Sequence, residues 1–290
     1  MIVVQLNGGL GNQLFQYALG RKLALCRNSD LRFDLRAFDH QGRQYKLGHY
    51  NVFGSPADPF ELSNNLWWGK RSFFTRPLGL LDNLRPYYRR HKISEISNVY
   101  DENILKAPPD VYISGYWQSE KYFKDIRSTL QKEIVLKDPL PQESQQLRNT
   151  IMNCESVSLH VRRGDYVTNR KTNEIHGILP LEYYHEAVGL ISNQIQSPEY
   201  FIFSDDISWA REKLRIHGKV NFVEDGGNER DHEDLILMSQ CKHHIIANSS
   251  FSWWGAWLCQ NSDKKVIAPR RWYKIDIDTR DLIPEDWTRL

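Results

Sequence analysis

The chain has 290 residues, enough for two domains that each bury a core of their own. Hydrophobic residues make up 40% and charged residues 26%, which are ordinary values for a globular protein. Because 38 Lys and Arg nearly balance 36 Asp and Glu, the formal charge of +2 gives no reason to expect a nucleic-acid partner. An anionic ligand would have to be held by local charge.

The four cysteines lie far apart and form no CxxC pair, so we expect free thiols in a reducing compartment rather than a zinc site or a disulfide framework. No apolar run reaches the roughly 20 residues of a membrane span. The N-terminus lacks the basic segment of a signal peptide. These features predict a cytoplasmic protein.

The N-terminal segment predicts a strand, a glycine-rich turn and a helix. An apolar strand at Met1–Gln5 is followed by the turn Asn7–Gln13 and by a helical pattern over Leu14–Cys26. Backbone N–H groups at such a turn can approach a phosphate. The turn lacks the third glycine of the dinucleotide fingerprint, which is Leu14 here, and the lysine of a P-loop. It is either a ligand contact or a plain tight connection.

Two further features of the first half bear on partners. A predicted strand at Val111–Ser114 leads into Tyr116, Trp117 and Gln118, and aromatic faces of this kind stack on sugar rings; Ser119 is placed to cap a helix over Glu120–Ile134. The stretch Lys70–Lys92 is rich in Lys, Arg and aromatic residues. It is either a solvated insertion or a surface for a polar acceptor or anionic lipid headgroups, which would give a peripheral membrane contact.

The second half alternates strands and helices, which predicts a parallel sheet covered by helices. We place the domain boundary in the proline-containing linker Lys137–Gln142, giving domains 1–140 and 141–290. The predicted strands are 157–161, 200–204, 220–223, 243–247 and 265–268, and the predicted helices are 181–194, 208–217, 231–242 and 250–260.

Polar clusters follow these strands where each one ends. They are residues 160–165, 204–206, 224–227, 248–250 and 270–271. Because the carboxyl ends of parallel strands share one edge of the sheet, the clusters predict a single ligand crevice.

The residue types in these clusters suit a nucleotide diphosphate. Arg162 and Arg163 can neutralise phosphates, and Ser249 with Ser250 stands at a predicted helix N-terminus, where free N–H groups attract anions. Asp205 and Asp206 can accept hydrogen bonds from guanine or ribose, or they can bind a divalent metal. The arginines favour the first reading because they make a metal redundant.

Taken together, four motifs of the sequence closely resemble those of the α-1,2-fucosyltransferases of glycosyltransferase family 11. They are residues 8–18 (GGLGNQLFQYA), 160–166 (HVRRGDY), 203–206 (FSDD) and 249–256 (SSFSWWGA). The resemblance implies inverting, metal-independent transfer of fucose from GDP-fucose to the 2-hydroxyl of a terminal galactoside, on an oligosaccharide or glycolipid, with no cofactor. It also implies an α/β fold of GT-B type, with two Rossmann-like domains facing a cleft, the first on the acceptor side and the second binding the donor. The absence of a membrane anchor resembles the bacterial enzymes of surface glycan (O-antigen) synthesis.

The resemblance also implies roles for individual residues. Arg162 would neutralise the departing β-phosphate and Arg163 would add a second contact. Guanosine would be bound by His160 with Asp205 or Asp206, the phosphates by Ser249 and Ser250, and the donor would also meet Asn12. Apart from the resemblance, the aromatic strand end predicts that the acceptor contacts Tyr116, Trp117 and Gln118. For the catalytic base the sequence leaves open Asp165, His176 and Glu174.

Two alternatives stand beside this reading. One is a metal-dependent nucleotide-sugar transferase that uses Asp205 and Asp206. The other is a glycan- or nucleotide-sugar-binding protein without turnover. A Rossmann oxidoreductase is disfavoured by the incomplete glycine fingerprint.

Overall fold

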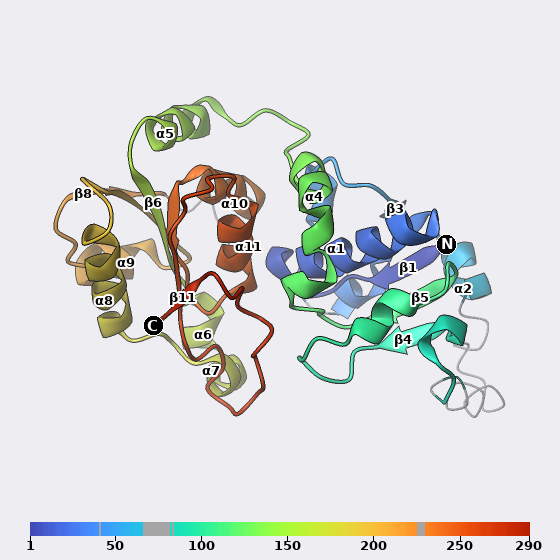
Figure 1. Cartoon of the computed structure of the whole chain (residues 1–290). Coiled ribbons are helices and arrows are strands. Elements are labelled where there is room, and N and C mark those ends of the chain that lie inside the picture. The colour runs from blue at the N-terminus through green and yellow to red at the C-terminus, as the bar shows by residue number, and fades with distance from the viewer. Residues whose placement is uncertain (41, 66–81, 83, 225–229) are drawn as a thin grey trace. The chain divides into compact units, whose positions relative to one another are not determined.

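The computed structural model describes the 290-residue chain except residues 41, 66–81, 83 and 225–229 (Figure 1). The chain forms two compact α/β units. The first comprises Met1–Val135 together with Arg280–Leu282, and the second comprises Leu136–Thr279 together with Ile283–Leu290. The chain therefore passes from the first unit to the second between Val135 and Leu136, just before the proline-containing linker.

The first unit is built on a five-stranded parallel sheet in the order β3-β2-β1-β5-β4. Its strands are β1 (Ile2–Gln5), β2 (Leu31–Asp34), β3 (Ser55–Pro56), β4 (Lys92–Ser94) and β5 (Val111–Ser114). Its α-helices are α1 (Leu10–Arg27), α2 (Pro59–Asn65) and α4 (Arg127–Glu133), and its short 3-10 turns are η1 (Arg36–His40), η2 (Leu47–His49), η4 (Tyr87–Arg89), η5 (Glu102–Lys106), η6 (Glu120–Tyr122) and η7 (Lys124–Ile126).

Helix α1 packs closely on the sheet because Gly20 lets it do so. A Cβ atom at Gly20 would lie 2.5 Å from the Val4 side chain on β1. Much of α1 is buried, including Leu14, Phe15 and Leu19. The predicted strand, turn and helix at the N-terminus are thus confirmed, with the helix starting earlier, at Leu10.

The helix predicted over Glu120–Ile134 is wrong as a single element. Ser119 does cap its start, accepting the Lys121 N–H at 3.3 Å. Phe123, however, has φ −146° and ψ 5°, which is not helical, and its fully buried ring packs 6.0 Å from Phe15. Burial of this ring outweighs helix continuity, so η6, η7 and α4 replace one helix.

The second unit contains a six-stranded parallel sheet in the order β11-β10-β9-β6-β7-β8. Its strands are β6 (Ser156–Val161), β7 (Glu199–Ser204), β8 (Lys219–Phe222), β9 (His243–Ile245), β10 (Val266–Ala268) and β11 (Thr288–Arg289). Its helices are α5 (Gln142–Met152), α6 (Gly164–Thr168), α7 (Arg170–His176), α8 (Leu181–Ser192), α9 (Ile207–Lys213), α10 (Asp231–Gln240) and α11 (Ser250–Leu258). The predicted alternation of strands and helices is confirmed.

The tryptophans of α11 belong to the core. Trp253, Trp254 and Trp257 are almost fully buried and contact one another, with the rings of Trp253 and Trp257 stacked at 6.0 Å. Helix α10 approaches closely at Gly255, where a Cβ atom would lie 3.0 Å from Met238. These rings therefore anchor α11 in the core of the second unit.

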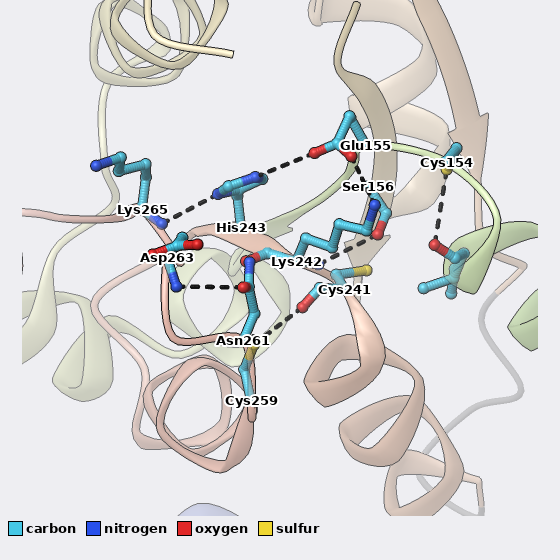
Figure 2. Close-up of polar contacts among 11 residues, drawn as sticks. Cys154, Glu155, Ser156, Cys241, Lys242, His243, Cys259, Asn261, Asp263 and Lys265 are labelled. Carbon is cyan, nitrogen blue, oxygen red and sulfur yellow. Dashed lines mark hydrogen bonds and ion pairs between the residues drawn. The ribbon is translucent and has the colours of Figure 1, made fainter. Parts of the chain in front are cut away.

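At the amino-terminal edge of the second sheet, polar side chains pair with one another and with the backbone (Figure 2). Lys242 Nζ donates to Glu155 at 2.6 Å, and His243 Nδ1 accepts the backbone N–H of Lys265 at 3.0 Å. The Cys259 thiol donates to the Cys241 carbonyl at 3.1 Å. All four cysteines are free, and Cys26 is exposed. Among the helices that the structure describes, none has the length and apolar character to cross a bilayer.

Candidate active site

Arg162 lies at the carboxyl end of the central strand β6, between two carboxylates. Its guanidinium is 2.6 Å from Asp165 Oδ1 and 2.8 Å from Asp205 Oδ2, which follows the neighbouring strand β7. Burial opposes its charge, but the pairing with Asp205 and Asp165 outweighs burial and raises the pKa of Arg162. With 22% of its side chain exposed, Arg162 is a fixed cation that a ligand can reach.

Arg163 is held by a second set of contacts. Its Nε donates to Asp206 Oδ2 at 3.1 Å, and its guanidinium lies 4.1 Å from the centre of the Trp209 ring. Asp206 also caps α9, accepting the Trp209 N–H at 3.2 Å. Adjacent side chains along an extended chain point in opposite directions. Arg162 and Arg163 accordingly pair with different carboxylates, Asp205 and Asp206.

Gly164 allows the two strand ends to meet. A Cβ atom there would lie 2.5 Å from Asp205 Oδ2, so any larger residue would displace that carboxylate. The Asp205 carboxylate is held against Gly164 because its Oδ1 accepts the backbone N–H of Arg163 at 2.7 Å.

His176 stacks beside the Arg162 cluster. Its ring lies parallel to that of Tyr166, with centroids 4.8 Å apart, and Arg162 lies over the Tyr166 ring at 5.3 Å. Burial lowers the pKa of His176, and Arg162 adds to this, while the nearby Asp165 raises it in part. A neutral imidazole at physiological pH can accept a proton. Glu174, in contrast, is an exposed partner of Arg170 at 2.9 Å.

His160 is buried in β6 with 4% of its surface exposed, and its Nδ1 has no hydrogen-bond partner. Burial, followed by the charge of Arg162, lowers the pKa of His160 to about 3. The ring contacts Phe251 on α11 at 5.6 Å. His160 is therefore neutral and adjoins both the arginine loop and α11.

The N-terminus of α11 forms the second wall of this region. The Ser249 hydroxyl accepts the Phe251 N–H at 3.3 Å, so this buried serine serves as the N-cap. Ser250 is the first helical residue and is half-buried. Tyr166 Oη donates to the Asn248 carbonyl at 3.1 Å and thereby connects α6 to the start of α11.

Asn12 and Gln118 in the first unit contact each other. Gln118 Nε2 donates to Asn12 Oδ1 at 2.9 Å, across a sequence separation of 106 residues. They meet because β1 and β5 are paired in parallel, so the residues that follow both strands share one edge. Gln16 supports this edge by donating to the Gly115 carbonyl at 3.0 Å and accepting the Asn7 N–H at 3.0 Å.

Tyr116 and Trp117 lie in different environments although they are adjacent. Tyr116 is 43% exposed, whereas Trp117 is 2% exposed and packs edge-on against Tyr122 at 5.7 Å. Glu95 holds the turn, accepting the Tyr116 and Trp117 N–H groups at 2.6 and 2.9 Å. Of the two rings, only that of Tyr116 is exposed, so the prediction that Trp117 contacts an acceptor is wrong for its buried ring.

Residues 89–290 match the sequence profile of Glycosyl transferase family 11. The chain belongs to glycosyltransferase family 11. The alpha-1,2-colitosyltransferase of Escherichia coli is 34% identical over 302 residues, covering 100% of this chain and 99% of the relative. The O-antigen biosynthesis glycosyltransferase WbnK of Escherichia coli is 30% identical, covering 92% of this chain and 93% of the relative.

The fold of this family 11 enzyme is of GT-B type, as predicted. The solved structure of NodZ alpha-1,6-fucosyltransferase, co-crystallised with GDP, superposes with a TM-score of 0.53, covering 88% of this chain and 91% of NodZ. At 14% identity this likeness concerns the fold alone.

The structure of this family 11 enzyme places the predicted site residues in two groups. Nine predicted site residues of the second unit lie along the carboxyl edge of its sheet: His160, Arg162, Arg163, Asp165, His176, Asp205, Asp206, Ser249 and Ser250. Asn12, Tyr116 and Gln118 lie along that of the first sheet, where the predicted acceptor residue Trp117 is buried instead. Of the predicted strand-end cluster 224–227, only Glu224 is described, and it pairs with Arg211. Most of the basic aromatic stretch Lys70–Lys92 lies outside the described residues.

The sequence placed Asn248 in a strand-end polar cluster but did not reveal its role at this edge. Asn248 is 2% exposed, and its Nδ2 points to three carbonyls, those of His176 (3.0 Å), Trp272 (3.2 Å) and Gly177 (3.5 Å). In the sequence, only the position of Asn248 just before Ser249 and Ser250 pointed to a role at this edge. The roles of Tyr166 as a connector and Trp209 as the surface under Arg163 were missed as well.

Proposed function

We propose that this family 11 enzyme transfers L-fucose from GDP-fucose to the 2-hydroxyl of a terminal galactoside, with inversion and without a metal, in the synthesis of a bacterial surface glycan. The observation that carries the proposal is Arg162, held by Asp165 and Asp205 beside the N-terminus of α11. A fixed guanidinium and the positive end of a helix dipole match the charge of a diphosphate.

In the proposed reaction the galactoside O2 attacks C1 of the donor sugar while the bond from C1 to the β-phosphate oxygen breaks. Negative charge grows on the departing GDP, and Arg162 stabilises it without reorganising, because its carboxylates already hold it. The hydroxyl proton passes to His176, whose pKa is lowered by burial. Asp165, paired with Arg162, orients the arginine.

Arginine pairing also supports the metal-independent form of this proposal. Asp205 and Asp206 each bind an arginine in the second unit, so a metal at these carboxylates would displace both contacts. A metal-dependent transferase is the alternative. Activity that survives excess EDTA supports our proposal, and activity restored by added metal after EDTA treatment supports the alternative.

A second donor has a specific observation in its favour. The alpha-1,2-colitosyltransferase relative covers this chain end to end. Colitose lacks only the 3-hydroxyl of L-fucose, so both sugars suit the same chemistry. The two donors therefore differ only in whether a hydroxyl is present at C3.

The test has two stages. Calorimetric titrations in EDTA with GDP, ADP and UDP are expected to show GDP-selective binding. Transfer assays with GDP-fucose and GDP-colitose on a galactoside, followed by NMR of the product linkage, then identify the sugar and the position. Binding without turnover of either donor would instead indicate the non-catalytic sugar-nucleotide-binding alternative.

A further inference from the structure

A basic cleft of about 610 Å³ lies in the first unit, away from the residues discussed above. Two segments line it: 85–91, with Arg85, Arg89, Arg90 and His91, and the short segment Pro108–Asp110. These segments come directly before β4 and β5. The cleft therefore opens at the amino-terminal edge of the sheet.

Its position separates it from the candidate active site. Gln118 and Tyr116 follow the carboxyl end of β5, at the opposite edge of the same sheet. A strand of four residues spans about 13 Å. A ligand in this cleft would not contact the acceptor-side residues.

The arginines of the cleft are held in place by local contacts. Arg90 Nε donates to the Arg85 carbonyl at 2.7 Å, and its guanidinium lies 4.3 Å from the Tyr87 ring centre. Arg89 lies over the Tyr88 ring at 5.5 Å. Arg85 forms an ion pair with Asp82 at 3.4 Å, whereas no carboxylate in the described part of the chain pairs with Arg89.

Two acidic residues lie near the cleft arginines, and both also contact backbone or terminal N–H groups. Asp82 is buried and accepts the backbone N–H groups of His91 and Lys92 at 3.0 and 3.1 Å. Asp110 lies 3.6 Å from the N-terminal amine, which also donates to the Pro109 carbonyl at 2.8 Å. The cleft thus keeps a net positive charge that suits phosphate.

Exposed apolar side chains border this charge. Leu84 is 82% exposed and Tyr88 is 56% exposed. Arginines beside an exposed leucine and tyrosine are the composition of a surface that rests at a lipid–water interface, whereas a free phosphate ion gains nothing from Leu84.

We infer that this cleft docks the enzyme on an anionic membrane, with its arginines on lipid phosphates and with Leu84 and Tyr88 at the acyl boundary. Such docking leaves the carboxyl edge of the same sheet facing away from the bilayer. It brings the enzyme to the surface on which lipid-borne glycans are built. The inference does not depend on which donor sugar is used.

The test is co-sedimentation of the full chain with vesicles of phosphatidylcholine alone or mixed with phosphatidylglycerol. Wild type is expected to bind only the mixed vesicles, and less as salt rises. Arg85→Gln with Arg89→Gln is expected to bind about 30-fold more weakly, the fold-change for ~1 kcal/mol per arginine at an anionic surface. Leu84→Ser should also weaken binding.

The matched control is Arg148→Gln with Arg215→Gln, which removes the same charge from exposed positions of the second unit. It should bind like wild type, and every variant should keep wild-type thermal unfolding and GDP binding. Equal vesicle binding by both double variants would overturn the inference. So would binding of inorganic pyrophosphate that depends on Arg85 and Arg89 without vesicle binding, because the cleft would then serve a free phosphate.

Discussion

Arg162 and Asp205 form an ion pair of 2.8 Å between the carboxyl ends of two adjacent parallel strands, β6 and β7. The other oxygen of Asp205 accepts the Arg163 N–H at 2.7 Å, so one carboxylate fixes both the backbone and the charge of the arginine loop. A cation that is already ordered loses little entropy when a phosphate binds. The four predictions below test what this arrangement and its surroundings do.

Gly164→Ala should impair the site while leaving the fold intact. The new Cβ would lie 2.5 Å from Asp205 Oδ2 and would push the carboxylate off Arg162, at a cost of about 1–3 kcal/mol. GDP affinity, measured by calorimetry, should fall about tenfold or more. The matched control is Gly189→Ala in α8, where a Cβ meets nothing within 4 Å and should stabilise the helix slightly. Equal GDP affinity in both variants would contradict the close approach.

His176→Gln should lower kcat by about 100-fold with little change in the affinity for GDP. The base must be neutral to accept a proton, and burial lowers the pKa of His176 below 6.5. The wild-type acid limb of kcat/KM should therefore lie below pH 6.5, with activity falling as the pH falls through it. A limb above pH 6.5, or a His176→Gln enzyme with full kcat, would remove His176 from this role.

His160 should make folding stability depend on pH. An unfolded imidazole protonates near pH 6.5, whereas the pKa of His160 in the folded chain is lowered to about 3. Between these values the unfolded state binds one more proton, so stability present above pH 6.5 is lost as the pH falls, by ~1.4 kcal/mol per pH unit.

Urea unfolding at pH 6 and pH 5 measures this slope. His160→Gln should make it shallower by ~1.4 kcal/mol per pH unit, even if the variant is less stable at pH 7. His217→Gln, at an exposed position, is the control and should leave the slope unchanged. Identical slopes in wild type and His160→Gln would show that His160 is protonated in the folded enzyme.

Asn248→Asp should destabilise the second unit although the two side chains have the same shape. The Asn248 amide donates toward three carbonyls, and a carboxylate in its place would repel them, at a cost of about 1–3 kcal/mol in the free energy of unfolding. Asn248→Ala should cost a similar amount. Asn193→Asp, at an exposed helix end, should be nearly neutral. Measurement is by urea unfolding, and an unchanged midpoint for Asn248→Asp would refute the organising role.

The second sheet was predictable because buried parallel strands are short apolar runs separated by amphipathic helices. Every predicted strand from 157–161 to 265–268 has a counterpart, within a few residues. The convergence of Arg162, Asp205 and Ser250 followed from that topology alone, since it needs only the rule that parallel strands end at one edge.

Contacts between distant residues were not predictable in this way. The Phe123 side chain broke a predicted helix by packing against Phe15. Trp117 turned into the core while Tyr116 stayed exposed, because Gly115 and Trp117 both adopt positive φ values, 148° and 57°. Asn248 gained its role from two loops, at 176–177 and 272, that only the folded chain brings to it.

The most direct test of the central claim is calorimetric binding of GDP and of guanosine to wild type and to Arg162→Ala, in EDTA. If Arg162 holds the diphosphate, wild type should bind GDP more tightly than guanosine. The variant should lose about 1.5–3 kcal/mol of that difference while its guanosine affinity is unchanged. If Arg162→Ala weakens guanosine and GDP equally, or neither, Arg162 does not hold the diphosphate and the proposed donor site is wrong.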